Sequence, residues 1–182
     1  MERDRFQENV LRAGEIFILS QWVQSQIVDL LILKQHPRIR GRFVKSVERV
    51  PRTLVVKRAR YWQRDFGSIA SEFEQEFPLS QAAVHDLHTL LAFRNALGHS
   101  YVSCARDYFL YRPSGKRGRK TRKLVKLWNV EKKKDSARPV LFKISFVEDA
   151  RYLKAYYVIT RMDQVHLSEA ASYIGVPHGR IR

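Results

Sequence analysis

The segment RNALGHS, residues 94 to 100, closes an otherwise apolar stretch with an arginine, an amide and a histidine. An imidazole titrates near neutral pH, so His99 could act as a general acid or base. A guanidinium binds phosphate through paired hydrogen bonds, which suits Arg94 to holding a phosphoryl group. The amide of Asn95 can orient a neighbouring side chain. Together the three side chains could move a proton and hold a charged phosphate without a metal ion.

Spacing between arginine and histidine carries no weight by itself, because Arg161 and His166 in RMDQVH repeat it. With 22 arginines and six histidines in 182 residues, about two matches are expected by chance. RNALGHS differs from RMDQVH in context, since asparagine directly follows its arginine and glycine directly precedes its histidine. An apolar helix also comes before it. The candidate site is therefore placed at RNALGHS.

The helix that must position these side chains is predicted over residues 81 to 97, with Ser80 as its N-cap. On a regular helix Arg94 and His99 would point about 140° apart. Gly98 can adopt a positive φ and end the helix, which would turn His99 back toward Arg94. Asn95 and His99 are four residues apart and are neighbours on the helix surface.

The remaining elements form a mainly α protein with a small antiparallel sheet. Helical spacing is expected over residues 5 to 34, before the break at His36-Pro37, and again from 61 to 77. Residues 41 to 60 are divided by Pro51. After His99, short alternating runs predict an antiparallel meander, and a last helix starts near Val147. We predict three segments: a helical core (1–105), a basic β-meander insertion (106–147) and a C-terminal helical segment packed on the core (148–182).

RNALGHS, near the end of a late helix, resembles the R-x4-6-H signature of the HEPN superfamily, which includes metal-independent endoribonucleases of toxin, abortive-infection and CRISPR-associated systems. The resemblance covers residues 5 to 105 and implies a HEPN-like helical bundle. It implies that His99 is the general acid or base for attack of an RNA 2′-hydroxyl on the adjacent phosphate. Arg94 would hold that phosphate, Asn95 would orient the histidine or the phosphate, and the product would carry a 2′,3′-cyclic phosphate.

The same resemblance implies a homodimer, because HEPN nucleases bring two motifs together in a cleft between protomers. It implies no cofactor and no metal, and it leaves open an antitoxin or defence-system partner. Candidate cleft residues on the first helix are Glu15, Gln21 and Gln24, for which simple exposure is an equal explanation. The other interpretation of the family is a noncatalytic nucleic-acid-binding or complex-forming HEPN protein, in which Arg94 and His99 are structural.

The net charge of +16 is concentrated in one segment, because residues 112 to 134 hold eleven basic residues and one acidic residue. Such a cationic loop favours binding to a phosphate backbone, and here to RNA. The alternatives are a solvated loop or a surface for an acidic protein. Tyr108, Tyr111 and Trp128 could stack on bases or simply pack. The predicted RNA-binding residues are Lys116, Arg117, Arg119, Lys120, Arg122 and Lys123.

Several classes of protein are disfavoured by the residues present. Cys104 is the single cysteine, and His85 and His88 are not accompanied by a third metal ligand, so no metal site is predicted. The start of the chain lacks the features of a secretory signal. Six polar residues interrupt the apolar window Ile16 to Leu33, which favours a buried amphipathic helix over a membrane span. We therefore expect a cytoplasmic protein without a membrane partner.

The C-terminal segment LSEAASYIGVPHGRIR resembles the opening of a helix-turn-helix through Ala171, Gly175 and Ile181. One interpretation is DNA reading, and the other is a helix and turn packed on the bundle. The function predicted for the whole chain is a metal-independent endoribonuclease in phage defence or acting as a toxin.

Overall fold

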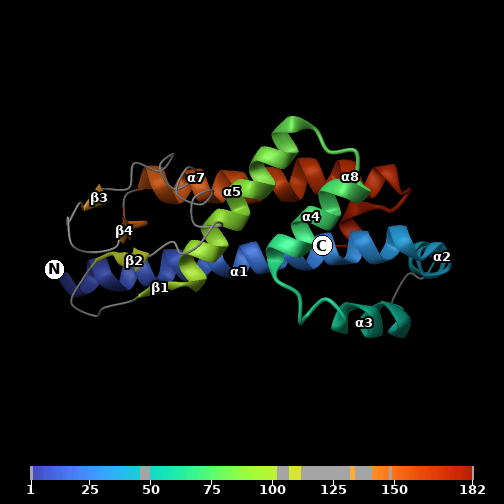
Figure 1. Ribbon diagram of the computed structural model, residues 1–182, viewed down its shortest axis with the longest axis horizontal. Coiled ribbons are helices and arrows are strands. Elements are labelled where there is room, and N and C mark those ends of the chain that lie inside the picture. Colours follow the sequence, from blue (N-terminus) through green and yellow to red (C-terminus); the bar gives the residue numbers. More distant parts are fainter. Residues whose placement is uncertain are drawn as a thin grey trace. The chain divides into compact units, whose positions relative to one another are not determined.

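The computed structural model describes residues 2–45, 50–101, 107–111, 132–133, 141–147 and 149–181 (Figure 1). It confirms a mainly α protein with a small antiparallel sheet and a C-terminal helix. The helices are α1 (Glu2–Gln35), α2 (Pro37–Lys45), α3 (Arg52–Ala59), α4 (Phe66–Glu76), α5 (Gln81–Gly98), α7 (Asp149–Arg161), the π-helix η1 (Met162–Leu167), α8 (Ser168–Tyr173) and the 3-10 helix η2 (His178–Arg180). The strands are β1 (Ser100–Tyr101), β2 (Phe109–Tyr111), β3 (Lys132–Lys133) and β4 (Leu141–Ile144).

Local sequence signals explain where several helices begin and end. Helix α1 ends at Gln35 and Pro37 opens α2, since proline is tolerated in the first turn of a helix. The Ser80 hydroxyl accepts a hydrogen bond from the Ala83 amide at 3.1 Å, which confirms the predicted N-cap of α5. The Asp65 carboxylate accepts from the Ser68 amide at 3.1 Å and caps α4 in the same way.

The backbone contacts divide the chain into two compact units. The first unit combines Met1–Ser20 with Thr89–Val158, and the second combines Gln21–His88 with Ile159–Arg182. Neither unit is a continuous stretch of sequence, because the division passes through α1, α5 and α7. The expected division into segments 1–105, 106–147 and 148–182 stays a prediction.

In the first unit, the four strands form an antiparallel sheet in the order β1-β2-β4-β3. The register pairs Tyr101 with Leu110, and Leu110 with Lys143. The sheet is attached to α1 by Asn9, which is 1% exposed and whose side-chain oxygen accepts from the Phe146 amide at 2.7 Å. Buried apolar side chains come from all parts of the unit: Ala13, Ile16, Leu90, Phe93, Phe109, Tyr111, Ile144, Phe146 and Ala155.

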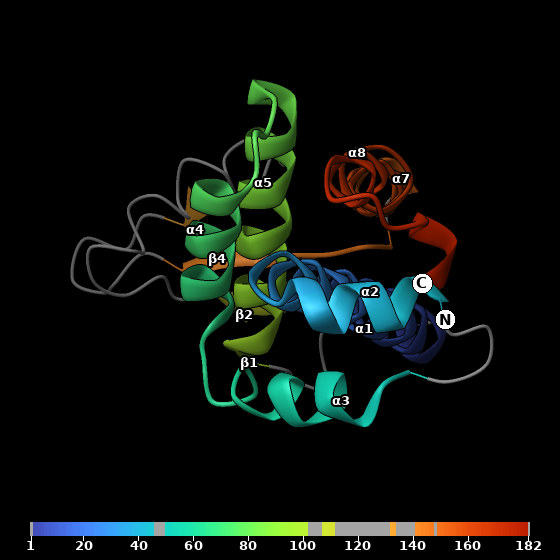
Figure 2. The ribbon, with the colours of Figure 1, turned by 90° about the vertical axis from the view of Figure 1, so that its right-hand side faces the viewer.

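In the second unit, α4 lies beside the first turns of α5 (Figures 1 and 2), and His88 Nε2 lies 2.6 Å from Glu74 Oε1. Helix α3 is attached to α1 by Arg58, which donates two hydrogen bonds of 2.6 Å to the carboxylate of Asp29. Asp29 is buried, and this burial raises its pKa while Arg58 opposes the shift. The core contains Val23, Ile27, Leu30, Leu31, Phe43, Leu54, Phe66, Ile69, Phe73, Leu87, Met162 and Leu167.

Helix α8 ends in a Schellman motif built on Gly175, which has a φ of 68°. The Val176 amide donates to the Ala171 carbonyl at 2.9 Å, and the Gly175 amide donates to the Ser172 carbonyl at 3.0 Å. Ala171 and Ile181 are buried. Beyond Gly175, the described residues form the short 3-10 turn η2 and no recognition helix. The C-terminal helix and turn are thus packed elements of the second unit.

By length and composition, one helical segment among the described residues could cross a membrane, namely Arg5–Gln35 of α1. Of its most apolar window, 61% is buried inside the protein. The core helix of a soluble protein has the same properties. The expected cytoplasmic location stays a prediction.

Candidate active site

The segment RNALGHS lies where α5 ends and the sheet begins. Arg94 and Asn95 are half-buried in the last turns of α5. His99 is exposed and is the single residue between α5 and β1. The Ser100 hydroxyl donates to the carbonyl of Ala96, one turn back in the helix. The imidazole of His99 is therefore open to solvent at the junction of a helix and a short strand.

Gly98 does not act as we expected. It is the last residue of α5 and keeps a helical backbone without a positive φ, which Gly175 adopts instead. The His99 amide donates to the Asn95 carbonyl at 3.1 Å, so helical hydrogen bonding continues through the end of α5. The prediction that a positive φ at Gly98 turns His99 back over the helix is wrong.

Because the helix continues, Arg94 and His99 leave it in directions about 140° apart, whereas Asn95 and His99 share a face. Arg94 Nη1 donates to Asn95 Oδ1 at 3.2 Å. The side-chain amide of Asn95 thus orients the guanidinium of Arg94. The backbone carbonyl of Asn95 accepts the hydrogen bond from the His99 amide. Within one chain, the backbone geometry places the arginine and the histidine on different sides of the helix end.

Two glycine substitutions test this description of the helix ends. We expect Gly98→Ala to raise stability by about 0.5 kcal/mol, because alanine favours the helix and its Cβ would lie 3.6 Å from Phe17 Cε2, an ordinary contact. We expect Gly175→Ala to lower stability by about 1 to 2 kcal/mol, because its φ is left-handed although the space is open. The melting temperature of each variant is the measurement. Destabilisation by Gly98→Ala alone would show that Gly98 needs a left-handed backbone.

Glu15, a predicted cleft residue, lies near α7 in the first unit. Its carboxylate accepts a hydrogen bond of 2.5 Å from the Tyr152 hydroxyl, and this bond raises the pKa of Tyr152 to about 12. Arg12 lies 5.0 Å from the centre of the Tyr152 ring. Glu15 therefore has a structural partner on α7. Gln21 and Gln24 belong to the second unit, and their side chains also have interaction partners.

The predicted RNA-binding residues Lys116, Arg117, Arg119, Lys120, Arg122 and Lys123 lie outside the described residues, as does Trp128. Of the other aromatic candidates for stacking, Tyr111 is 5% exposed and packs in the core of the first unit. Tyr108 is half-buried, and Lys143 Nζ lies 4.6 Å from its ring centre. The packing interpretation therefore holds for Tyr111, and a cation already occupies one face of Tyr108.

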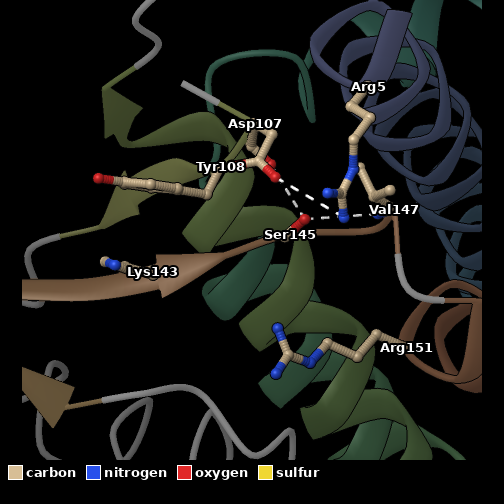
Figure 3. Close-up of a pocket in the computed structure, with 7 residues that line it drawn as sticks. All are labelled: Arg5, Asp107, Tyr108, Lys143, Ser145, Val147 and Arg151. Carbon is tan, nitrogen blue, oxygen red and sulfur yellow. Dashed lines mark hydrogen bonds and ion pairs between the residues drawn. The ribbon is translucent and has the colours of Figure 1, made fainter. Parts of the chain in front are cut away.

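Sequence reasoning missed a pocket in the first unit, with a volume of about 190 Å³, because its residues come from distant parts of the sequence: α1, the segment just before β2, β4 and the segment just after it, and α7. Arg5 points toward Asp107 and Ser145, whereas Lys143 and Tyr108 point to another side (Figure 3). Arg5 Nη2 lies 4.0 Å from Asp107 Oδ2, and the Ser145 hydroxyl donates to the Asp107 carbonyl at 3.0 Å. Three of the polar groups that line the pocket, on Arg5, Asp107 and Ser145, therefore already interact with one another. Its full lining is Arg5, Asp107, Tyr108, Lys143, Ser145, Val147 and Arg151.

The second arginine and histidine pair, in RMDQVH, has a structural role in the second unit. The Arg161 guanidinium donates two hydrogen bonds to the Asp86 carboxylate, and His166 Nε2 lies 3.0 Å from Asp86 Oδ2. Asp86 is completely buried and His166 is 4% exposed. Arg161 is the last residue of α7, and His166 belongs to the π-helix η1, whose i→i+5 hydrogen bonds turn side chains away from their α-helical directions. Arg161 thus forms an ion pair with a buried carboxylate, and His166 hydrogen-bonds to the same carboxylate.

The described residues contain no group of three or more histidine, cysteine, aspartate or glutamate side chains placed to hold a metal ion. His88 is hydrogen-bonded to Glu74, and His85 is exposed on α5.

Comparison with known proteins found no matching family model, no matching curated protein and no matching solved structure.

Proposed function

We propose that the protein is a HEPN-type, metal-independent endoribonuclease that acts in phage defence or as a toxin. The observation that carries the proposal is the end of α5, where Arg94 is hydrogen-bonded to Asn95 and the imidazole of His99 is exposed four residues later. These side chains are the ones that the resemblance of RNALGHS to the HEPN signature requires. The helical character of the chain agrees with that superfamily.

In the reaction, the phosphorus that joins two nucleotides stays bonded to the 3′-oxygen of the first ribose. It exchanges its bond to the 5′-oxygen of the next nucleotide for a bond to the 2′-oxygen of that first ribose. One His99 accepts the 2′-hydroxyl proton while the 2′-oxygen bonds to phosphorus. The bond from phosphorus to the 5′-oxygen breaks, and the leaving 5′-oxygen takes a proton from the second His99 of the proposed homodimer or from water. Arg94 holds the phosphate and the negative charge that develops on it. Asn95 holds the guanidinium in position through the 3.2 Å hydrogen bond. The products are a 2′,3′-cyclic phosphate and a 5′-hydroxyl.

The divergence of Arg94 and His99 on one helix favours a site formed by two copies of the chain. In a homodimer that brings two ends of α5 together, the Arg94 of one protomer can face the His99 of its partner. The exposure of His99 leaves it accessible for this arrangement. We therefore include a homodimer in the proposal, with RNA as substrate and an antitoxin or defence-system protein as an open further partner.

A second candidate function is a noncatalytic HEPN protein that binds nucleic acid or forms a complex. The observation that favours it is the hydrogen bond from Arg94 to Asn95, which also suits a purely structural role at a helix end. In that case Arg94 would serve the end of α5 and His99 would be an ordinary surface residue.

The two functions are separated by RNA cleavage in the presence of EDTA. The endoribonuclease should cleave single-stranded RNA with its activity unchanged by EDTA, and its 5′ fragments should end in 2′,3′-cyclic phosphate. Their ends are identified by resistance to phosphatase before acid treatment and by mass. A folded protein that binds RNA and leaves it intact would support the noncatalytic function, and linear 3′-phosphate or 3′-hydroxyl ends formed directly would contradict the proposed chemistry.

A further inference from the structure

The second unit contains a second cationic region, which is distinct in sequence from RNALGHS and from the basic segment of residues 112–134. Between Pro37 and Arg64 the sequence holds ten lysines and arginines and one acidic residue, Glu48. Arg58 is bound to the buried Asp29, and Arg64 is bound to Glu72. Seven others have no ion pair or side-chain hydrogen bond with any described residue; we call them the α2–α3 cations: Arg38, Arg40, Arg42, Lys45, Arg52, Lys57 and Arg60.

These cations are held on structured elements at the same end of the second unit (Figures 1 and 2). Phe43 of α2 is 2% exposed and Leu54 of α3 is fully buried, so each helix contributes an apolar side chain to the core. The bidentate contact of Arg58 with Asp29 attaches α3 to α1. The Arg180 guanidinium donates to the Val44 carbonyl at 2.6 Å, which attaches the C-terminal turn to α2.

Neighbouring positive charges repel one another and lower the stability of the fold. A sequence selected for stability alone would place acidic side chains among them. Here the described acidic side chains of this end neutralise Arg58 and Arg64 and leave the α2–α3 cations to solvent. The turn after α3 also presents Trp62, which is 78% exposed. A polyanion with stackable rings would use both features, because cations bind its phosphates and an indole stacks on an unpaired base.

We propose that the α2–α3 cations and Trp62 bind the phosphate backbone and one base of a single-stranded RNA. The choice of RNA rests on the proposed endoribonuclease function, for which this surface would be a substrate-binding region additional to the end of α5. The preference for a single strand follows from Trp62, since a duplex keeps its bases stacked on one another.

An anionic membrane surface is a different partner for cations near exposed apolar side chains. Membrane-surface helices separate an apolar face from a cationic face. In α3 the exposed Val55 and Val56 are three and four residues from Arg52, so the cation lies between them on the helix surface. In α2 the apolar side is buried through Phe43. Neither helix presents a separate apolar face, and nucleic acid is the better match.

The test measures binding of the full chain, carrying His99→Ala to prevent cleavage, to a fluorescent single-stranded RNA in EDTA. One variant replaces four cations (Arg38→Gln, Arg42→Gln, Arg52→Gln and Arg60→Gln). A matched control lowers the net charge equally at exposed sites on α4 and α5 (Ser71→Glu, Gln75→Glu, Gln81→Glu and Ala82→Glu). We expect the first variant to bind at least roughly tenfold more weakly than the control and its salt dependence to fall by about three in log–log slope.

Trp62→Ala separates stacking from charge. We expect roughly tenfold weaker binding to the single strand and unchanged binding to a duplex RNA of the same length. The inference is overturned if the four-cation variant binds RNA as tightly as the matched control. It is also overturned if that variant keeps its RNA affinity but loses binding to vesicles containing phosphatidylserine, which would assign the surface to a membrane.

This binding assay needs no catalysis, so it is independent of the proposed activity. Cleavage by the wild type combined with normal RNA binding by the four-cation variant would retain the endoribonuclease and remove this surface from its substrate-binding region. Loss of RNA binding in that variant, with no cleavage by the wild type, would retain the surface and support the noncatalytic function.

Discussion

Replacing His99 by alanine is expected to lower the rate of RNA cleavage by roughly 10²- to 10⁴-fold, the usual contribution of a positioned general acid or base. The imidazole is exposed at the end of α5, so the substitution removes no core contact and should leave stability within about 0.5 kcal/mol of wild type. Initial rates with labelled RNA in EDTA are the measurement. Arg94→Ala should cause a loss of similar size, because both residues serve one transition state.

The matched control for this loss is His85→Ala. His85 is also exposed and belongs to the same helix α5, but it lies near the helix start and outside RNALGHS. It should cleave RNA at the wild-type rate. If His99→Ala keeps full activity while folded, or if His85→Ala and His99→Ala lose activity equally, then His99 is not a catalytic residue.

Replacing Asp86 by alanine is expected to lower the free energy of unfolding by about 3 kcal/mol, since it leaves the Arg161 guanidinium without its counter-charge and removes a hydrogen-bond partner of His166. Asp86 is completely buried, and both Arg161 and His166 depend on its carboxylate. Arg161 is one-third exposed, so water moderates the loss on its side. For a chain of this size the melting temperature should fall by about 6 to 12 °C.

The free energy of unfolding of the Asp86→Ala protein is measured by urea denaturation, and two further substitutions serve as controls. Asp86→Asn keeps the shape and part of the hydrogen bonding, so its cost should be smaller than that of alanine. Asp149→Ala removes an ion pair with Arg12 in which the carboxylate is 76% exposed, so solvent screens the pair and the substitution should cost far less stability than Asp86→Ala. An Asp86→Ala protein as stable as Asp149→Ala would contradict the structural role assigned to Arg161 and His166.

The comparison of RNALGHS with RMDQVH shows how far sequence context could go. Both pairs have the same spacing, and the asparagine, the glycine and the preceding helix selected Arg94 and His99 as the candidate site. What context could not reveal is the reason that Arg161 and His166 are present. Their partner Asp86 is 75 and 80 residues away in the sequence, and a contact over that separation has no local signal.

Gly98 shows the opposite limit. Glycine at the end of a helix is a frequent sign of a left-handed turn, but it permits that backbone without requiring it. Here β1 starts two residues later, and the chain passes into the sheet through a continued helical hydrogen bond. The assembly of the site therefore shifts from a turn within one chain to the proposed pairing of two chains.

Net charge per segment of the sequence favoured residues 112 to 134 as the nucleic-acid-binding region and not residues 38 to 60. Over the first 111 residues, acidic residues such as Asp29 and Glu72 offset most of the positive charge, so the net charge of that part of the sequence is low. The structure shows which acidic groups are used inside the second unit and which cations remain. The candidate surface on α2 and α3 became visible through that pairing.

The amino-acid sequence by itself determined the mainly helical class, the break at His36-Pro37, the Ser80 cap and the antiparallel strands. The helical class, the break and the cap depend on interactions within a few residues, and the strands were indicated by their local alternation of apolar and polar residues, so local patterns are sufficient to predict them. The pairing of β2 with β4 joins residues that are far apart in the sequence. The tertiary structure alone decided that Arg161 and His166 bind Asp86, that Gly98 stays helical and that Arg58 is neutralised by Asp29. Such outcomes depend on contacts between distant residues and on burial, which only the folded chain defines.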